Sequence, residues 1–107
     1  MRIGIVGTGF VAKLRAELFS QDARVQLKAI AGSLDKAKEI AQAFGMEAHE
    51  YWSELVIRPD IDLVVVANIN RDHSTVVSQA LRCGKHVIVE YPLSFNLAEA
   101  EELVQLA

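Results

Sequence analysis

The sequence predicts an α/β domain with a doubly wound parallel sheet in the strand order 3-2-1-4-5. Short runs of apolar, β-branched residues alternate along the chain with stretches of helical periodicity. The run Ile61–Ala67 is almost continuously apolar, which is typical of a strand buried on both faces. A glycine-rich turn follows the first run. The length of 107 residues, of which 51% are hydrophobic and 23% charged, fits a single globular domain.

The first predicted strand, Arg2–Val6, leads directly into a turn with the pattern G-x-G-x-x-A, formed by Gly7-Thr8-Gly9-Phe10-Val11-Ala12. The first glycine permits a tight turn and the second lets the backbone approach a pyrophosphate, while the small alanine lets helix and strand pack closely. The N–H groups and the positive dipole end of the following helix suit phosphate. The turn therefore predicts a dinucleotide site, and a plain β–turn–α connection is the alternative.

The next elements follow from apolar spacing and capping residues. A helix is predicted over Phe10–Ser20, with Val11, Leu14, Leu18 and Phe19 near one face. A strand over Val25–Ala31 follows. A second helix is predicted over Asp35–Phe44, ended by Gly45 as its C-cap and packed through Ala37, Ile40, Ala41 and Phe44.

The second half of the chain continues the alternation. The predicted elements are a short strand Met46–His49, a brief helix capped by Ser53 and reaching Ile57, the strand Ile61–Ala67, a polar loop Asn68–Asp72, a helix His73–Cys83 ended by Gly84, a strand His86–Glu90 and an amphipathic helix Asn96–Ala107. Each strand but the last is followed by a helix before the next strand, so right-handed crossovers and a parallel sheet are expected.

The residues after the second strand bear on the choice of cofactor. Where NAD is preferred, an acidic residue about 20 positions after the glycines binds the ribose 2′-hydroxyl. This chain has Gly32 and Ser33 at that point, and Lys36 adds a cation shortly after. A hydroxyl donor and an ammonium favour NADP, with NAD as the alternative. Lys36 as an ordinary solvated helix residue also stays open.

Two further loops are predicted at the same edge of the sheet. Ala67 and the amides of Asn68 and Asn70 are expected to line the cofactor crevice, and His73 begins the next helix. His73 is a candidate catalytic or cofactor-binding residue, with a polar helix start as the alternative. After the last strand, Glu90 is expected to hold the nicotinamide ribose or to cap a neighbouring helix. Tyr91 offers a phenol as a proton donor or orienting group, or simply packs at the strand end.

Composition excludes several classes of function. A net charge of −3 provides no basic field for nucleic acid or an anionic membrane. The three histidines lack metal-ligand spacing and there is no G-x-S-x-G elbow, so no metal site and no serine hydrolase are predicted. The single cysteine, Cys83, is expected to be a small buried residue. No signal peptide or membrane span is visible, which favours a reducing, cytoplasmic compartment.

Together these motifs carry a family resemblance over essentially the whole chain. The turn Gly7–Ala12, the run Asp60–Ala67, His73, and the segment from Ala80 through Gly84-Lys85-His86 to Glu90 resemble the glucose-fructose oxidoreductase / inositol dehydrogenase / MocA family. The resemblance implies a Rossmann domain that binds NADP or NAD. It also implies a larger substrate domain beyond residue 107, so the chain is expected to be a fragment, and the missing domain is expected to form a homo-oligomer interface.

One departure from the family pattern bears on the substrate. The family usually has Glu-Lys-Pro, with a catalytic lysine, where this chain has Glu90-Tyr91-Pro92. Tyrosine in that place is similar to the biliverdin reductase branch, particularly its cyanobacterial form, and implies hydride transfer from NADPH to biliverdin. A sugar or polyol dehydrogenase and a non-catalytic nucleotide-sensing protein are the alternatives.

Overall fold

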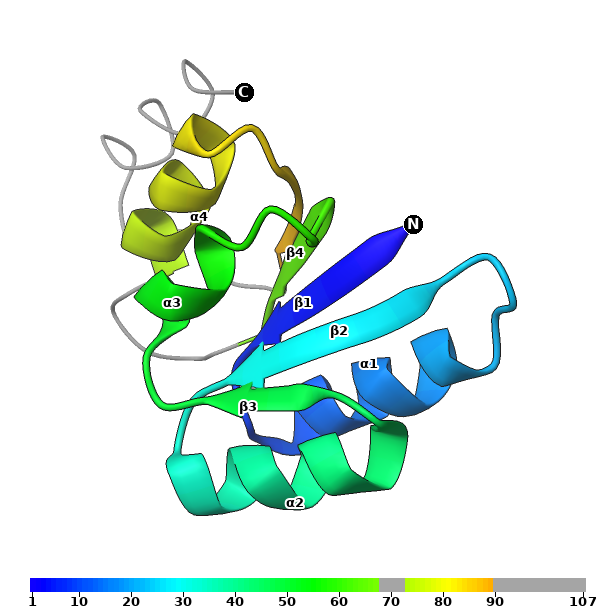
Figure 1. Ribbon diagram of the computed structural model, residues 1–107. Helices are drawn as coiled ribbons and strands as arrows, with labels where there is room; N and C mark the ends of the chain where they lie inside the picture. Colours follow the sequence, from blue (N-terminus) through cyan, green and yellow to red (C-terminus); the bar gives the residue numbers. More distant parts are fainter. Residues whose placement is uncertain (68–72, 90–107) are drawn as a thin grey trace.

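Five parallel strands form one sheet in the order β3-β2-β1-β4-β5 (Figure 1). The computed structural model describes residues 1–67 and 73–89. The strands are β1 (Arg2–Val6), β2 (Gln26–Ala31), β3 (Glu47–His49), β4 (Leu63–Val66) and β5 (His86–Val89), and the helices are α1 (Phe10–Ser20), α2 (Leu34–Phe44), α3 (Trp52–Val56) and α4 (His73–Arg82). The predicted fold class and strand order are confirmed, and the predicted helix 96–107 lies outside the described residues.

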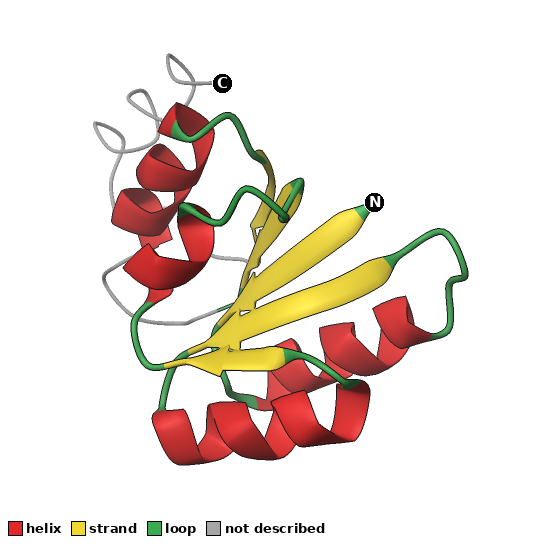
Figure 2. Ribbon diagram, viewed as in Figure 1, coloured by secondary structure: helices red, strands yellow, loops and turns green. Residues whose placement is uncertain are grey.

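Helices cover both faces of the sheet, as Figure 2 shows. On one face, small and branched residues of α1 and α2 pack on the sheet, with Ala12, Ala16, Ala37, Ile40 and Ala41 in the core. On the other face, α3 and α4 contribute Leu55, Val56, Val76, Val77 and Ala80. None of the helices in the described ranges is long and apolar enough to cross a membrane.

The first strand of the chain is the central strand of the sheet. β1 pairs with β2 on one side and with β4 on the other, where Ile3 lies opposite Leu63 and Ile5 opposite Val65. Side chains alternate between the two faces along each strand, so both cores draw on β1. The carboxyl ends of β1, β2 and β4 consequently meet at one edge of the sheet, which brings together the loops that follow these strands.

The observed bounds differ from the predicted ones by one or two residues at most. Gly45 caps α2 in the left-handed conformation with φ +70°, as predicted. The prediction that Ser53 caps the short helix is wrong, because α3 begins at Trp52 and Tyr51 is its N-cap. Glu54 replaces the expected serine contact: its Oε1 accepts a hydrogen bond from the Tyr51 amide at 3.3 Å.

The predicted inner face of α1 is wrong for two of its four residues, Leu14 and Leu18, whereas Val11 and Phe19 are partly buried against the core. Ala12 and Ala16 are completely buried, whereas the exposed fractions of Leu14 and Leu18 are 49% and 54%. A helix rests closest to a sheet on its smallest side chains, so the two alanines, one helical turn apart, define the contact face. Val11 and Phe19 flank this contact face and pack against its edge.

Cys83 is exposed, so its predicted burial is wrong. The buried stripe of α4 runs through Val76, Val77 and Ala80. The Cys83 amide still donates to the Gln79 carbonyl at 3.0 Å, but α4 ends at Arg82, and Gly84, with φ +77°, turns the chain toward β5. Cys83 therefore lies at the end of the helix, where nothing in the described residues buries it.

Ion pairs tie the amino ends of the central strands together, at the edge opposite the glycine turn. The Arg2 guanidinium lies 3.0 Å from Asp62 Oδ1, and the Arg2 amide donates to Asp62 Oδ2 at 2.9 Å. The hydrogen bonds from Arg2 lower the pKa of Asp62 to about 2. This clamp joins the start of β1 to the residue just before β4.

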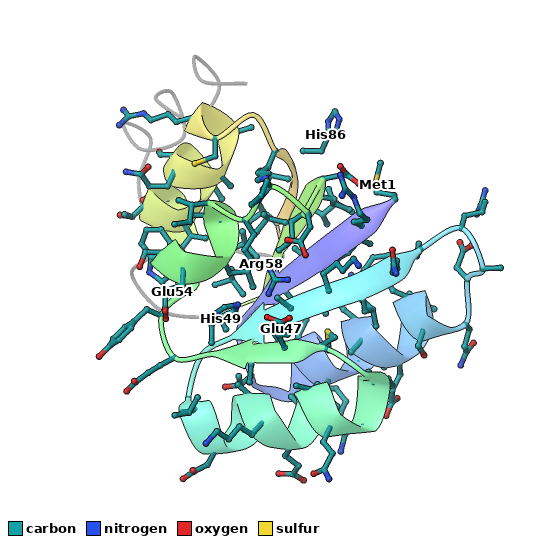
Figure 3. All side chains as sticks on the ribbon, in the orientation of Figure 1. Met1, Glu47, His49, Glu54, Arg58 and His86 are labelled. Carbon is teal, nitrogen blue, oxygen red and sulfur yellow. The ribbon has the colours of Figure 1, made fainter. Side chains whose placement is uncertain are left out.

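A second clamp lies beside the edge strand β3 (Figure 3). The Arg58 guanidinium donates to both carboxylate oxygens of Asp60 and to Glu47 Oε2, and its Nη1 lies 3.0 Å from His49 Nε2. Lys85 Nζ donates to the backbone carbonyl oxygens of Arg58 and Ile61. These charged groups have structural partners and lie outside the crevice described next.

Candidate functional site

A crevice of about 870 Å³ opens at the carboxyl ends of β1, β2 and β4. Residues 6–11, 31–34, 50–52 and 67 line it. The volume lies within the range of small-molecule and cofactor sites, and the edge of the sheet where the crevice opens is where ligands bind in open α/β sheets.

The glycine turn forms the floor of this crevice. Gly7 has φ +127°, a conformation that favours glycine, and its amide donates to the Ala31 carbonyl at 2.8 Å. Gly9 differs, because its φ of −84° and ψ of −167° are open to any residue. A Cβ built on Gly9 has no heavy atom within 4 Å, so it would enter open space. The fold itself does not require glycine at this position. A ligand that binds close to the backbone would require it, because a side chain would block its approach.

The start of α1 has no internal partner for its first amides. Gly9 is the N-cap, no side chain caps the helix, and the first turn contains no acidic residue. The first helical bond runs from the Lys13 amide to the Gly9 carbonyl at 3.1 Å, which leaves the amides of Phe10, Val11 and Ala12 without a partner inside the helix. Free N–H groups at an uncompensated dipole end fit a pyrophosphate.

The end of β2 is closed to a side chain. A Cβ built on Gly32 would lie 2.6 Å from Thr8 Cγ2 and 3.0 Å from Thr8 Oγ1. The Gly32 amide donates to the His49 carbonyl at 3.1 Å, which holds this loop against β3. Ser33 is the exposed N-cap of α2, and its hydroxyl makes no capping hydrogen bond. Thus the crevice offers a serine hydroxyl, not a carboxylate, at the end of β2.

The crevice brings together Gly7, Thr8, Gly9, Phe10, Val11, Gly32, Ser33 and Ala67, eight of the residues predicted to bind cofactor. Ala12 does not line the crevice. It is a buried residue of α1 and makes the predicted close contact between helix and sheet. Lys36 lines a neighbouring hollow instead. His73 is the first residue of α4, and its role stays a prediction. Asn68, Asn70, Glu90 and Tyr91 lie outside the described residues.

Sequence reasoning missed one wall of the crevice, which Glu50, Tyr51 and Trp52 form. These residues directly follow β3, and the carboxyl ends of parallel strands share one edge, so their position after a third strand was the available signal. They add a carboxylate and two aromatic rings to the lining of the crevice, and these groups suit the amino group and the flat face of a nucleobase.

Comparison with known proteins agrees with this geometry. All of residues 1–107 match the family described as oxidoreductase family, NAD-binding Rossmann fold (GFO_IDH_MocA). Myo-inositol 2-dehydrogenase from Thermotoga maritima is 33% identical over 107 residues, which cover 98% of this chain and 32% of that protein.

Two solved structures are similar along the whole described fold. Biliverdin reductase from Synechocystis sp. PCC 6803, in complex with biliverdin and NADP⁺, has a TM-score of 0.93 and 43% identity over 99% of this chain and 34% of its own. A 3-ketoreductase from Actinomadura kijaniata with NADP has a TM-score of 0.92 and 32% identity over 100% of this chain and 35% of its own. The chain thus spans about a third of the length of the relatives it matches.

Proposed function

We propose that this chain, which belongs to the oxidoreductase family with an NAD-binding Rossmann fold, is the cofactor-binding part of an NADPH-dependent reductase. The two thirds of its relatives that it does not span would correspond to a substrate domain and an oligomer interface. When bound, NADPH supplies the hydride. The residues that line the crevice bind and orient this cofactor.

The observation that favours NADP over NAD is the lack of room for a side chain at Gly32, directly after β2. A carboxylate on the ribose 2′-hydroxyl is the usual selector for NAD, and it would repel a 2′-phosphate. Here Gly32 has no room for a side chain beside Thr8, and the next residue is a serine with an uncommitted hydroxyl. Asp35, in the first turn of α2, lines neither the crevice nor the hollow beside it.

The chain's own residues have distinct tasks in this proposal. The amides of the first turn of α1 hold the pyrophosphate, and Gly9 leaves the approach to them open. Glu50, Tyr51 and Trp52 provide the wall for the adenine. Ala67, at the end of β4, leads toward the nicotinamide end, where Asn68, Asn70, His73 and Glu90 are proposed to act.

For the substrate we propose biliverdin or a similar linear tetrapyrrole. The support is the likeness to the Synechocystis enzyme and the segment Glu90-Tyr91-Pro92, in which Tyr91 would orient the substrate or donate a proton. The likeness to myo-inositol 2-dehydrogenase favours a polyol dehydrogenase as the second candidate. Its weakness is that tyrosine stands in place of the lysine that would serve as a base for an alcohol.

Cofactor choice is tested by titrating NADP and NAD into the chain and into Ser33→Asp. The wild type should bind NADP more tightly, and the new carboxylate should lower NADP affinity at least about tenfold and spare NAD. Ser33→Ala is the matched control, because it removes the hydroxyl without adding charge. Tighter binding of NAD by the wild type would refute the proposal.

Substrate choice is tested on the full-length protein by following the visible spectrum of biliverdin with NADPH. Loss of the biliverdin band is expected. Reduction of NADP⁺ by myo-inositol, with no change in biliverdin, would assign the second candidate. Tight NADPH binding with turnover of neither compound would support a nucleotide-sensing protein.

A further inference from the structure

The wall of the crevice belongs to a loop that is closed at its base. His49 ends β3, Tyr51 and Trp52 follow it along the crevice, and α3 then leads back toward β3. There Arg58 Nη1 lies 3.0 Å from His49 Nε2, although the two residues are nine positions apart in the chain. Figure 3 shows both side chains over β3. The contact therefore joins the two ends of the loop that carries the wall.

The protonation state of His49 follows from this contact. A guanidinium has only N–H donors and stays charged in proteins, so His49 Nε2 must be the acceptor. A ring nitrogen that accepts a hydrogen bond carries no proton, which makes the imidazole neutral, with its one proton on Nδ1. A second proton would remove the acceptor and would place two positive groups 3.0 Å apart.

The Arg58 guanidinium is held in place by other partners. Its Nε and Nη2 donate to the two carboxylate oxygens of Asp60 at 2.8 and 2.6 Å, and the Arg58 side chain is only 16% exposed. These hydrogen bonds lower the pKa of Asp60 to about 2, so the Asp60 carboxylate keeps its charge near neutral pH. Lys85 Nζ also donates to the Arg58 carbonyl. Consequently, His49 is the partner that moves when the two side chains separate.

Hydrogen bonds among the described residues connect the His49 ring to Arg58 and to no other charged group. Glu47, on the same face of β3, accepts from Arg58 Nη1 at 2.9 Å, but its side chain is 72% exposed and screened by water. On that face β2 places two alanines opposite these β3 residues, α3 packs through apolar side chains, and α2 lies on the other face of the sheet. The further charged residues of the adjoining segments are Lys28, Glu50, Glu54, Asp60 and Lys85.

We propose that His49 and Arg58 are positioning residues for the crevice wall, and that their contact holds the wall only while His49 is neutral. Protonation opens the base of the loop, and the aromatic wall then loses its fixed place beside the nucleobase. The bond from the Gly32 amide to the His49 carbonyl, at 3.1 Å, does not titrate, so β3 itself stays attached. This deepens the proposed function, and its effect on binding rests on that function.

An imidazole changes its charge between about pH 5 and 8, so the test compares NADP binding to the chain at about pH 8 and about pH 5.5. Acid should cost the wild type about fivefold more affinity than it costs His49→Gln, because glutamine offers Arg58 an oxygen acceptor that does not titrate. Ionisation of the 2′-phosphate is common to both proteins and cancels.

Two control variants exclude other titrating groups. His86 is an exposed histidine of β5, and His86→Gln should keep the pH dependence of the wild type. Glu47→Gln should keep it as well, because the carboxylate of Glu47 is not the group that gains the proton. Loss of the pH dependence in either control would argue against His49 as its source.

Trp52 reports the position of the wall without any ligand, because it is the single tryptophan of the chain. Its emission should shift between the two pH values in the wild type and stay constant in His49→Gln. His49→Lys, charged at both pH values, should show the acid emission throughout. An equal shift in wild type and His49→Gln would overturn the proposal. If the wild type bound neither dinucleotide, the proposed function would fail, and the emission of Trp52 would still decide on the His49–Arg58 contact.

Discussion

Replacing Gly9 with valine separates what the fold needs from what the cofactor needs. The backbone at Gly9 has φ −84° and ψ −167°, which valine adopts readily, and a Cβ there meets nothing within 4 Å. Valine is a poorer N-cap than glycine but has less freedom in the unfolded chain. The two effects oppose each other, so the free energy of unfolding should change by less than about 1 kcal/mol.

The effect on binding should be much larger. The same Cβ would occupy the open space at the start of α1, where the amides of Phe10, Val11 and Ala12 have no partner inside the helix. A branched side chain there holds the pyrophosphate away, and loss of two charge-assisted hydrogen bonds at about 1.5 kcal/mol each amounts to about 3 kcal/mol. The dissociation constant for NADP should rise more than about 100-fold.

Trp52 makes the assay direct, because it is the single tryptophan of the chain and it lines the crevice. NADP is titrated while the tryptophan emission is followed, and thermal unfolding is recorded on the same samples. Gly7→Ala is the contrasting variant: with φ +127° at that position, it should cost about 1–3 kcal/mol of folding stability. Wild-type affinity in a folded Gly9→Val variant would refute the placement of the pyrophosphate on this turn.

Three further predictions concern the clamps and the thiol. Since the hydrogen bonds from Arg2 lower the pKa of Asp62 to about 2, that carboxylate should stabilise the fold above about pH 4, and this contribution should fade as pH falls toward 2. Urea midpoints should then depend less on acid pH in Asp62→Asn, and an unchanged dependence would contradict the clamp. Lys85→Met should lower the free energy of unfolding by about 1–3 kcal/mol, because two carbonyl acceptors lose their ammonium donor, and a urea midpoint equal to the wild type would argue against that role. Cys83 should react with a thiol reagent as fast in the native protein as in urea, whereas protection in the native state would contradict its exposure.

The fold was predictable from the sequence because its signals are local. The apolar run ending at Val66 and the left-handed cap at Gly45 each act within a few residues. The face of α1 was not predictable in the same way. Hydropathy ranks Leu14 and Leu18 above Ala12, but the sheet selects the side chain by size, and that choice depends on how closely helix and sheet approach.

The candidate site likewise contains residues that could be predicted from the sequence and residues that could not. The glycine turn and the residues after β2 follow strands that are strongly marked in the sequence. Glu50, Tyr51 and Trp52 follow a strand of only three residues, so their place at the same edge emerges only once β3 is paired with β2. Lys36 was predicted from its place after β2, but the hollow that it lines forms only where α1 and α2 pack together. Residues that meet through tertiary packing leave no periodic signal.

The position of β1 at the centre of the sheet has a consequence for biosynthesis. As the chain leaves the ribosome, β1 can pair with β2 after a short delay, but its other edge stays unpaired until β4 emerges, and Arg2 and Asp62 are 60 residues apart. A nascent chain therefore carries an open, strongly apolar strand edge until β4 emerges, and this edge is a template for wrong pairing. Closure of that edge is a long-range step, so it should set the folding rate, and the Arg2–Asp62 clamp would act late by locking the register once β4 has docked.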